Sequence, residues 1–232
     1  LEREQAIKGA VNLGFYVAPA WEEIHYQKDG HDVTIYGWAD CLAVGMVDPI
    51  RVSCSHLTAQ EIADMLGLML PTSRMSDAAY VAAAGKLPVM PIAQAKLSQM
   101  MTTAEMIAYS DRVEAKKQQS GQSFVRDPGK DWVNSERLIG PDGKPAPPTK
   151  STIGAGGGPT PASANFGWHS DSAPYKSPGG AKVFQSVGLA HDYHHVDYSQ
   201  VLTLYRQWCA VDGVPRKIED VLKDPSMAYL LS

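Results

Sequence analysis

The segment His191-Asp192-Tyr193-His194-His195-Val196-Asp197-Tyr198-Ser199-Gln200 leads directly into an apolar run, Val201-Leu202-Thr203-Leu204-Tyr205. It holds three of the seven histidines of the chain, together with two carboxylates, two phenols and a hydroxyl. Burying such polar side chains is costly unless each one finds a hydrogen-bond partner. Because the segment enters a run that is typical of buried β structure, we predict that residues 191–200 form the functional site.

The backbone of this segment can be extended or helical. In an extended chain alternate residues share a face, which groups His191, Tyr193, His195, Asp197 and Ser199. In a helix, His191 and His195 are neighbours four positions apart. Both geometries therefore place His191 and His195 on one side, and the strand adds Asp197 and Ser199 to them.

Two chemistries fit this group of side chains. His191, His195 and Asp197 are ligand types for zinc or another divalent transition metal, although their spacing is not an HExxH signature. Alternatively, Asp197, a histidine and Ser199 form a carboxylate–histidine–hydroxyl relay, with Tyr198 as a further candidate catalytic residue. The structural alternative is a polar rim above a strand, in which backbone carbonyls satisfy the histidines.

A second histidine region lies upstream, at Asn165-Phe166-Gly167-Trp168-His169. The segment Val183–Val187 is strand-like and leads towards His191. Antiparallel pairing of the strands next to the two histidines would bring His169 and His191 together, so His169 is a candidate for a distant catalytic residue. The alternative is that His169 simply packs beside Trp168.

The composition restricts the class of protein. The chain has 232 residues, 44% of them hydrophobic, and a net charge of −4. This hydrophobic content suits a globular core. The absence of a basic tract predicts no nucleic-acid partner. No apolar run approaches the length of a membrane span.

The chain has three cysteines, Cys41, Cys54 and Cys209. Residues 41–44 and 51–54 read as strands joined by a turn at Asp48-Pro49. If these strands pair, Cys41 and Cys54 approach each other, so we expect either one disulfide with one free thiol or three reduced thiols.

The pattern of elements predicts a single α+β domain over residues 1–232. We expect a mainly antiparallel sheet built from the early strands and the C-terminal strands, with helices at residues 58–67, 75–84 and 103–118 packed on one side. Residues 140–163 are rich in Gly and Pro with almost no large apolar side chain, which predicts a long flexible loop or insertion.

The first functional hypothesis is a hydrolase that acts on an amide, ester or glycosidic bond of a small or polymeric substrate. Water or Ser199 would attack, His191 or His169 would act as base, and Asp197 would orient the imidazole. In a metal-assisted version, His191, His195 and Asp197, or His169, would hold the ion that activates water.

The second hypothesis is a non-catalytic module that binds carbohydrate or a cell surface through an aromatic platform. Convergence of His169, His191 and Asp197 in a pocket would favour catalysis, whereas a flat aromatic strip would favour binding. The candidate platform residues are Trp38, Trp132, Trp168, Tyr175, Tyr193 and Tyr198.

Two short motifs, Phe166-Gly167-Trp168-His169 and His195-Val196-Asp197-Tyr198-Ser199-Gln200, resemble segments of uncharacterised bacterial exported proteins. This resemblance implies a location outside the cytoplasm and implies no activity.

Overall fold

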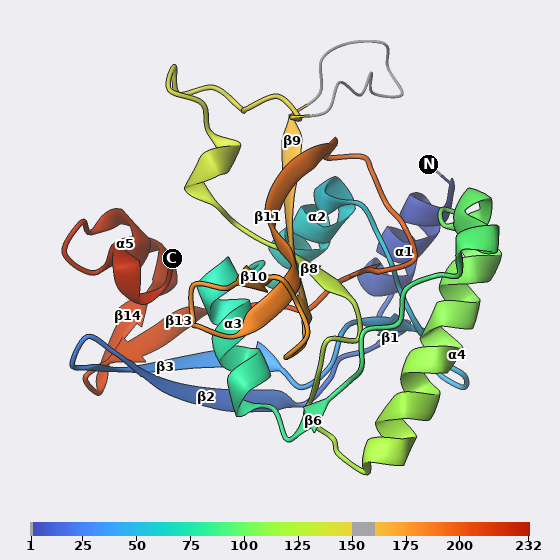
Figure 1. Cartoon of the computed structure of the whole chain (residues 1–232), viewed down its shortest axis with the longest axis horizontal. Helices are drawn as coiled ribbons and strands as arrows, with labels where there is room; N and C mark the ends of the chain where they lie inside the picture. The colour runs from blue at the N-terminus through green and yellow to red at the C-terminus, as the bar shows by residue number, and fades with distance from the viewer. Residues whose placement is uncertain (1, 150–160) are drawn as a thin grey trace.

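A computed structural model describes residues 2–149 and 161–232 and confirms the α+β class, with several mainly antiparallel sheets (Figure 1). The helices are α1 (Glu2–Asn12), α2 (His56–Leu66), α3 (Ser73–Ala82), α4 (Thr103–Ser120) and α5 (Ile218–Lys223), with 3₁₀ turns η1 (Gln94–Gln99), η2 (Glu136–Leu138) and η3 (Ala228–Leu230). The strands are β1 (Tyr16–Val17), β2 (Trp21–Lys28), β3 (His31–Trp38), β4 (Ala43–Val44), β5 (Ile50–Arg51), β6 (Gly85–Lys86), β7 (Val125–Arg126), β8 (Lys130–Trp132), β9 (Ala162–His169), β10 (Tyr175–Lys176), β11 (Lys182–Asp192), β12 (Gln200–Val201), β13 (Tyr205–Val211) and β14 (Val214–Lys217).

Early and C-terminal strands form one sheet, as predicted, in the order β14-β13-β3-β2. Its inner face is apolar because alternate residues such as Val33 and Ile35 are buried. The β13–β14 turn contains Asp212 and Gly213, and both have positive φ. This is the turn geometry that an Asp-Gly pair favours in a hairpin. The remaining strands divide among further sheets instead of joining this one.

The sheet that positions the candidate site has the order β10-β11-β9-β8-β12. Its two long strands, β9 and β11, pair antiparallel as predicted. Their register places His169 opposite Val183 and His191 opposite Ser163, with irregularities on either side of Gly188. The two histidines therefore lie at different ends of the strand pair.

Helix α3 connects these two sheets, because it packs against β2 of one sheet and β9 of the other (Figure 1). Its N-cap is Thr72, whose hydroxyl accepts a hydrogen bond from the Met75 N–H. Met75 and Ala79 are buried in the apolar cluster beneath the β2–β3 hairpin. This packing fixes the position of α3, which carries two residues of the candidate site.

The predicted helices are present, with shifted ends. Helix α2 begins at His56 instead of residue 58, because Ser55 caps it and accepts the Thr58 N–H at 3.3 Å. It ends at Gly67, whose left-handed conformation (φ 65°) suits a residue without a side chain. Helix α4 begins after Thr102, where the predicted range 103–118 starts, and the Thr102 hydroxyl caps it by accepting the Glu105 N–H at 3.2 Å.

The central part of the predicted loop at residues 140–163 lies outside the described residues, which stop at 149 and resume at 161. The described edges are hydrogen-bonded. The Gly140 N–H donates to the Lys144 carbonyl, and the Thr149 N–H donates to the Leu189 carbonyl. Strand β9 begins at Ala162, inside the predicted range. Among the described helices, none combines the length and the apolar character needed to cross a bilayer.

Of the two alternatives expected for the cysteines, the structure shows three free thiols and no Cys41–Cys54 disulfide, and all three cysteines are buried. Strand β4 pairs with β5 as predicted, with Ala43 opposite Arg51. Continuing this register places Ser53, and not Cys54, opposite Cys41. Neighbouring residues of an extended chain point to opposite faces, so the Cys54 side chain is directed away from Cys41.

We therefore expect all three thiols per chain to react with a thiol reagent under denaturing, non-reducing conditions. In the folded protein the reaction should be slow, because burial raises the pKa of the Cys41 and Cys54 thiols and leaves little reactive thiolate. Counting modified thiols by mass spectrometry tests this. A single reactive thiol would show instead that two of the cysteines are cross-linked.

Candidate functional site

His169 lies between two carboxylates that come from distant parts of the chain. Its Nε2 is 2.8 Å from Asp77 Oδ1, and its Nδ1 is 3.0 Å from Asp127 Oδ1. Carboxylates at both ring nitrogens require an N–H at each, so the imidazole is a charged imidazolium. The side chain of His169 is 1% exposed. We call these three residues the histidine clamp.

The clamp joins four segments. Asp77 comes from α3, Asp127 follows β7, and His169 ends β9. The other oxygen of Asp77 accepts the Ser177 hydroxyl at 2.5 Å and the Gly179 N–H. A Cβ at position 179 would lie 2.1 Å from Asp77 Oδ2, so this turn requires glycine. The turn at residues 177–179 is thus tied to the same helix as His169.

Burial and the neighbouring charges shift the pKa values of the clamp residues in opposite directions. Burial lowers the pKa of His169, but the hydrogen bonds and charges of Asp127 and Asp77 outweigh burial and raise this pKa to about 9. Burial also raises the pKa of Asp127, against the lowering effect of His169. An imidazolium that donates both N–H groups has no lone pair, so it does not serve as a general base. The expectation that His169 acts as a catalytic base therefore has no support in this geometry.

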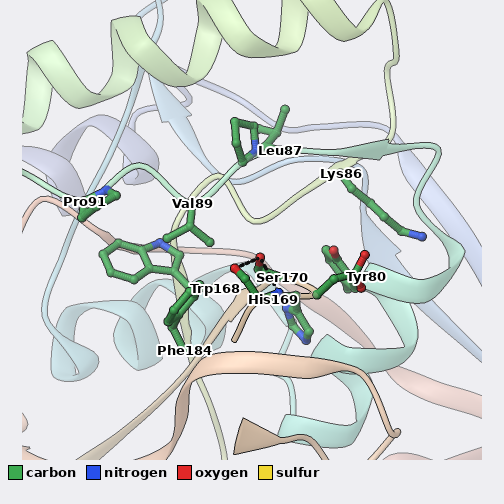
Figure 2. Close-up of a pocket in the computed structure, with 12 residues that line it drawn as sticks. Tyr80, Lys86, Leu87, Val89, Pro91, Trp168, His169, Ser170 and Phe184 are labelled. Atoms are coloured by element: carbon green, nitrogen blue, oxygen red, sulfur yellow. Dashed lines mark hydrogen bonds between the residues drawn. The ribbon is translucent and has the colours of Figure 1, made fainter. Parts of the chain in front are cut away.

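A cavity of about 760 Å³ opens above the clamp. Tyr80 stacks on the His169 ring, with centroids 4.2 Å apart and planes at 11°. Figure 2 shows Trp168 and Phe184 towards one end of the cavity, and Tyr80 and Lys86 towards the other. The full lining consists of Tyr80, Lys86, Leu87, Pro88, Val89, Pro91, Trp168, His169, Ser170, Asp171, Ser172 and Phe184.

Two non-glycine residues at this site have left-handed backbones. Trp168 has φ 57° and Asp127 has φ 64°. Each such conformation costs about 1–3 kcal/mol and persists only where the surroundings hold it. Asp127, in this conformation, accepts hydrogen bonds from both the backbone N–H and the Nδ1–H of His169. Trp168, in the same conformation, has an indole that lines the cavity.

The segment 191–200 is neither a continuous strand nor a helix. Strand β11 ends at Asp192, and two turns, at residues 193–194 and 198–199, flank the irregular residues 195–197. The predicted neighbours nevertheless contact one another in a chain, from His191 to His195, from His195 to Asp197, and from Asp197 to Ser199. The rings of His191 and His195 stack with centroids 3.8 Å apart, and His195 Nε2 lies 3.8 Å from Asp197 Oδ2. Ser199 Oγ then donates to Asp197 Oδ1 at 2.6 Å.

Asp197 is held as a buried anion. Burial raises the pKa of Asp197, but His195, Lys130 and Ser199 outweigh burial and hold this pKa well below its usual range. Its carboxylate accepts the N–H and hydroxyl of Ser199 and the side-chain amide of Gln200. In a catalytic relay the hydroxyl bonds the histidine, whereas here it bonds the carboxylate. The observed order is therefore that of a structural anchor.

Among residues 2–149 and 161–232, no group of three or more His, Cys, Asp or Glu side chains is placed so that it could hold a metal ion. The predicted ligands His191 and His195 stack with planes only 7° apart. The lone pairs of an imidazole lie in the plane of its ring, so stacked rings do not direct them at a common point. The structure therefore does not support the predicted zinc or transition-metal set of His191, His195 and Asp197.

The structure does not bring His169 and His191 together. Six positions separate His169 from Ser163, the partner of His191, and this distance along a strand is about 20 Å. Trp168 and Lys130 connect the two regions instead. Lys130 Nζ lies 4.9 Å from the Trp168 ring and 3.7 Å from Asp197 Oδ2. The polar segment thus lies behind the cavity wall and does not open into the cavity.

The residues of the predicted aromatic platform lie in different surroundings. Trp38 and Trp132 are core residues, 2% and 1% exposed, and cannot contact a ligand. Trp168 lines the cavity, where a ligand could reach it. Tyr80 and Phe184 line the same cavity, but the sequence did not identify them as candidates. Sequence reasoning also missed Asp77. The one signal for it was a carboxylate on the inward face of a predicted helix, three positions before Tyr80.

Comparison with known proteins finds no match for this chain among family models, curated proteins or solved structures. The interpretation of the site therefore rests on its own geometry.

The clamp predicts a loss of stability at alkaline pH. A histidine whose folded pKa of about 9 exceeds its ordinary value of 6.5 contributes full stability below 6.5 and loses it as pH rises through about 9. The contribution is on the order of 3 kcal/mol. Urea unfolding followed across this pH range should show a falling midpoint. His169→Gln should be less stable at neutral pH and should lack this alkaline loss. The exposed His25→Gln is the control, and equal pH profiles for both variants would contradict the role of the clamp.

Asp197→Asn tests the anchor. The substitution keeps the side-chain volume. It replaces the Asp197 oxygen that accepts the Gln200 side-chain N–H with an NH₂ group, and it removes the negative charge beside Lys130. We expect a loss of about 2–4 kcal/mol in the free energy of unfolding. The difference in unfolding free energy between wild type and variant should shrink as pH falls below 3.8, the ordinary pKa of an aspartate. The reason is that a carboxylate whose pKa is lowered in the folded state stabilises the fold above that pH and loses this contribution when it is protonated. Asp192→Asn is the control, since within the described chain this carboxylate accepts one hydrogen bond, from the His194 N–H at 2.8 Å. A variant as stable as wild type would exclude the anchor role.

Proposed function

We propose that this protein is a binding module that accepts a carbohydrate ring in the cavity above the histidine clamp. The observation that supports this proposal is the lining of the cavity. Aromatic and proline side chains form its walls, and short polar side chains stand beside Trp168. Recognition sites for small ligands commonly combine an apolar wall with a few polar groups that fix orientation.

The chemistry of a sugar suits these two kinds of surface. The C–H face of a pyranose is apolar and stacks on an indole, whereas its hydroxyls need donors and acceptors around the ring edge. Ser170 and Ser172 lie together, with their hydroxyl oxygens 2.9 Å apart, and Asp171 lies between them in sequence. These groups offer both donors and acceptors to a ligand stacked on Trp168.

The clamp supports binding more than catalysis at this location. Of the titratable residues that line the cavity, His169 is buried beneath Tyr80 with both ring nitrogens in hydrogen bonds. It therefore stiffens the floor of the cavity and leaves the contact surface to Trp168, Tyr80 and Phe184. A rigid floor lowers the entropic cost of ordering the site when a ligand binds.

A hydrolase that acts on an ester, amide or glycosidic bond is the second candidate. It is favoured by one observation, that His195 Nε2 is buried, has no hydrogen-bond partner within 2–149 and 161–232, and faces the ionised Asp197. In this candidate Asp197 would orient the imidazole through Nε2–H, and the other ring nitrogen, Nδ1, would act as the general base. His195 and Asp197 would catalyse outside the aromatic cavity, because residues 191–200 do not line it.

One experiment separates these candidates. Oligosaccharides of glucose, xylose and N-acetylglucosamine are tested for binding by calorimetry and for shortening by chromatography. Binding without shortening is expected. Trp168→Ala should weaken the binding on the order of thirtyfold, as for the removal of a central aromatic contact.

Trp208→Ala is the control, because Trp208 is 50% exposed and lies on β13 outside the cavity, whereas Trp168 is partly buried in the cavity wall. It should leave affinity unchanged. If no oligosaccharide binds, or if both tryptophan variants behave alike, the cavity is not a sugar site. Time-dependent shortening that His195→Ala abolishes would establish the hydrolase instead.

A further inference from the structure

The segment Leu87–Ile92, which we call the strap, forms one wall of the cavity. Two of its residues are Pro88 and Pro91, which have no N–H to donate. At its start, the Leu87 N–H donates to the Arg126 carbonyl at 3.0 Å. At its end, the Ile92 N–H donates to the hydroxyl oxygen of Tyr198 at 2.7 Å. Within the described chain, these two bonds hold the strap backbone, and no other is found between Pro88 and Ile92.

Tyr198 itself is firmly positioned. Its N–H donates to the Met100 carbonyl at 2.9 Å, and its ring meets Tyr109 edge to face with centroids 5.0 Å apart. It is 4% exposed and belongs to an apolar cluster that also receives Met90 and Ile92 of the strap. The hydroxyl that accepts the Ile92 N–H is therefore a fixed point of the structure.

The Tyr198 side chain also contacts Trp168, another residue of the cavity wall. The rings of Tyr198 and Trp168 have centroids 6.5 Å apart, and Figure 2 shows Trp168 beside Val89 and Pro91 of the strap. Tyr198 thus touches Trp168 with its ring and holds the strap with its hydroxyl. A change at this one residue acts on both parts of the wall.

We infer that Tyr198 is a positioning residue that sets the width of the cavity by tying the strap to the wall that carries Trp168. This inference rests on the proposed binding function for its biological meaning but not for its test. It gives the polar segment 191–200 a task, because the anchored Asp197 and Ser199 hold Tyr198 in place from either side along the chain.

Tyr198→Phe tests the inference without any ligand, since it keeps the ring and removes the acceptor of the Ile92 N–H. Amide hydrogen exchange of Ile92 should become on the order of tenfold faster, as expected when one hydrogen bond is lost. Tyr193→Phe is the matched control, because it removes a phenol hydroxyl from the same segment but does not contact the strap. Ile92 exchange should be unchanged in that control.

Acrylamide, a small quencher that enters open clefts, reports the width of the cavity. The contribution of Trp168 to fluorescence quenching is obtained by comparing each protein with and without Trp168→Phe. Quenching of Trp168 should increase in Tyr198→Phe and remain unchanged in Tyr193→Phe.

Ile92→Pro provides a second variant, because it removes the donor of the same bond and keeps the Tyr198 hydroxyl. It should reproduce the increased quenching. Circular dichroism verifies that each variant is folded. Wild-type Ile92 exchange and quenching in folded Tyr198→Phe would overturn the inference, as would wild-type quenching in folded Ile92→Pro or equal changes in Tyr193→Phe. Failure of every oligosaccharide to bind would count against the proposed function alone.

Discussion

The buried ion pair network of His169, Asp77 and Asp127 is the interaction on which the rest of this site depends. It places one positive charge between two negative charges at a point almost free of solvent. Such a group is costly to desolvate, and breaking it by the loss of one partner costs about 3–5 kcal/mol. The clamp therefore contributes less to net stability than to specificity. It forces α3, the end of β9 and the turn at residues 177–179 into one arrangement, and this arrangement is the floor of the cavity.

Different residues stabilise the cavity and line it. The charged groups are turned inward, towards one another, whereas Trp168, Tyr80 and Phe184 face the cavity. The left-handed backbone of Trp168 illustrates how the two tasks are linked. Its conformation is unfavourable by itself, but the clamp at the next residue and Lys130 beneath the indole hold it in place. Local strain at a cavity wall is consistent with a contact role for the strained residue.

The polar segment 191–200 shows that a dense group of titratable side chains need not be a reaction centre. Asp197 accepts bonds from the residues that follow it, and the histidines before it stack on each other. These contacts turn a costly set of buried polar groups into a rigid corner between β11 and β12. The corner carries Tyr198, which reaches the strap and Trp168. A segment that looks catalytic from its composition thus connects the sheet with the cavity wall.

Local chemistry determined the helices, the strands and some neighbours. Thr102 as a helix cap, Gly67 as a helix end and the Asp212–Gly213 hairpin could be predicted because each depends on a few adjacent residues. The proximity of His191 and His195 could be predicted for the same reason, since they are four positions apart.

The tertiary structure alone decided which partners each side chain received. His169 meets Asp77 and Asp127 across 92 and 42 residues of chain, and no periodicity in the sequence encodes such a meeting. It depends on the register of β9 and β11 and on the packing of α3, which arise from burial summed over the whole core. Burial and hydrogen-bond partners also decide whether a histidine is neutral, with a free lone pair on one ring nitrogen, or is a charged imidazolium that donates from both. Sequence could therefore identify His169 as notable, but only the fold could show what it does.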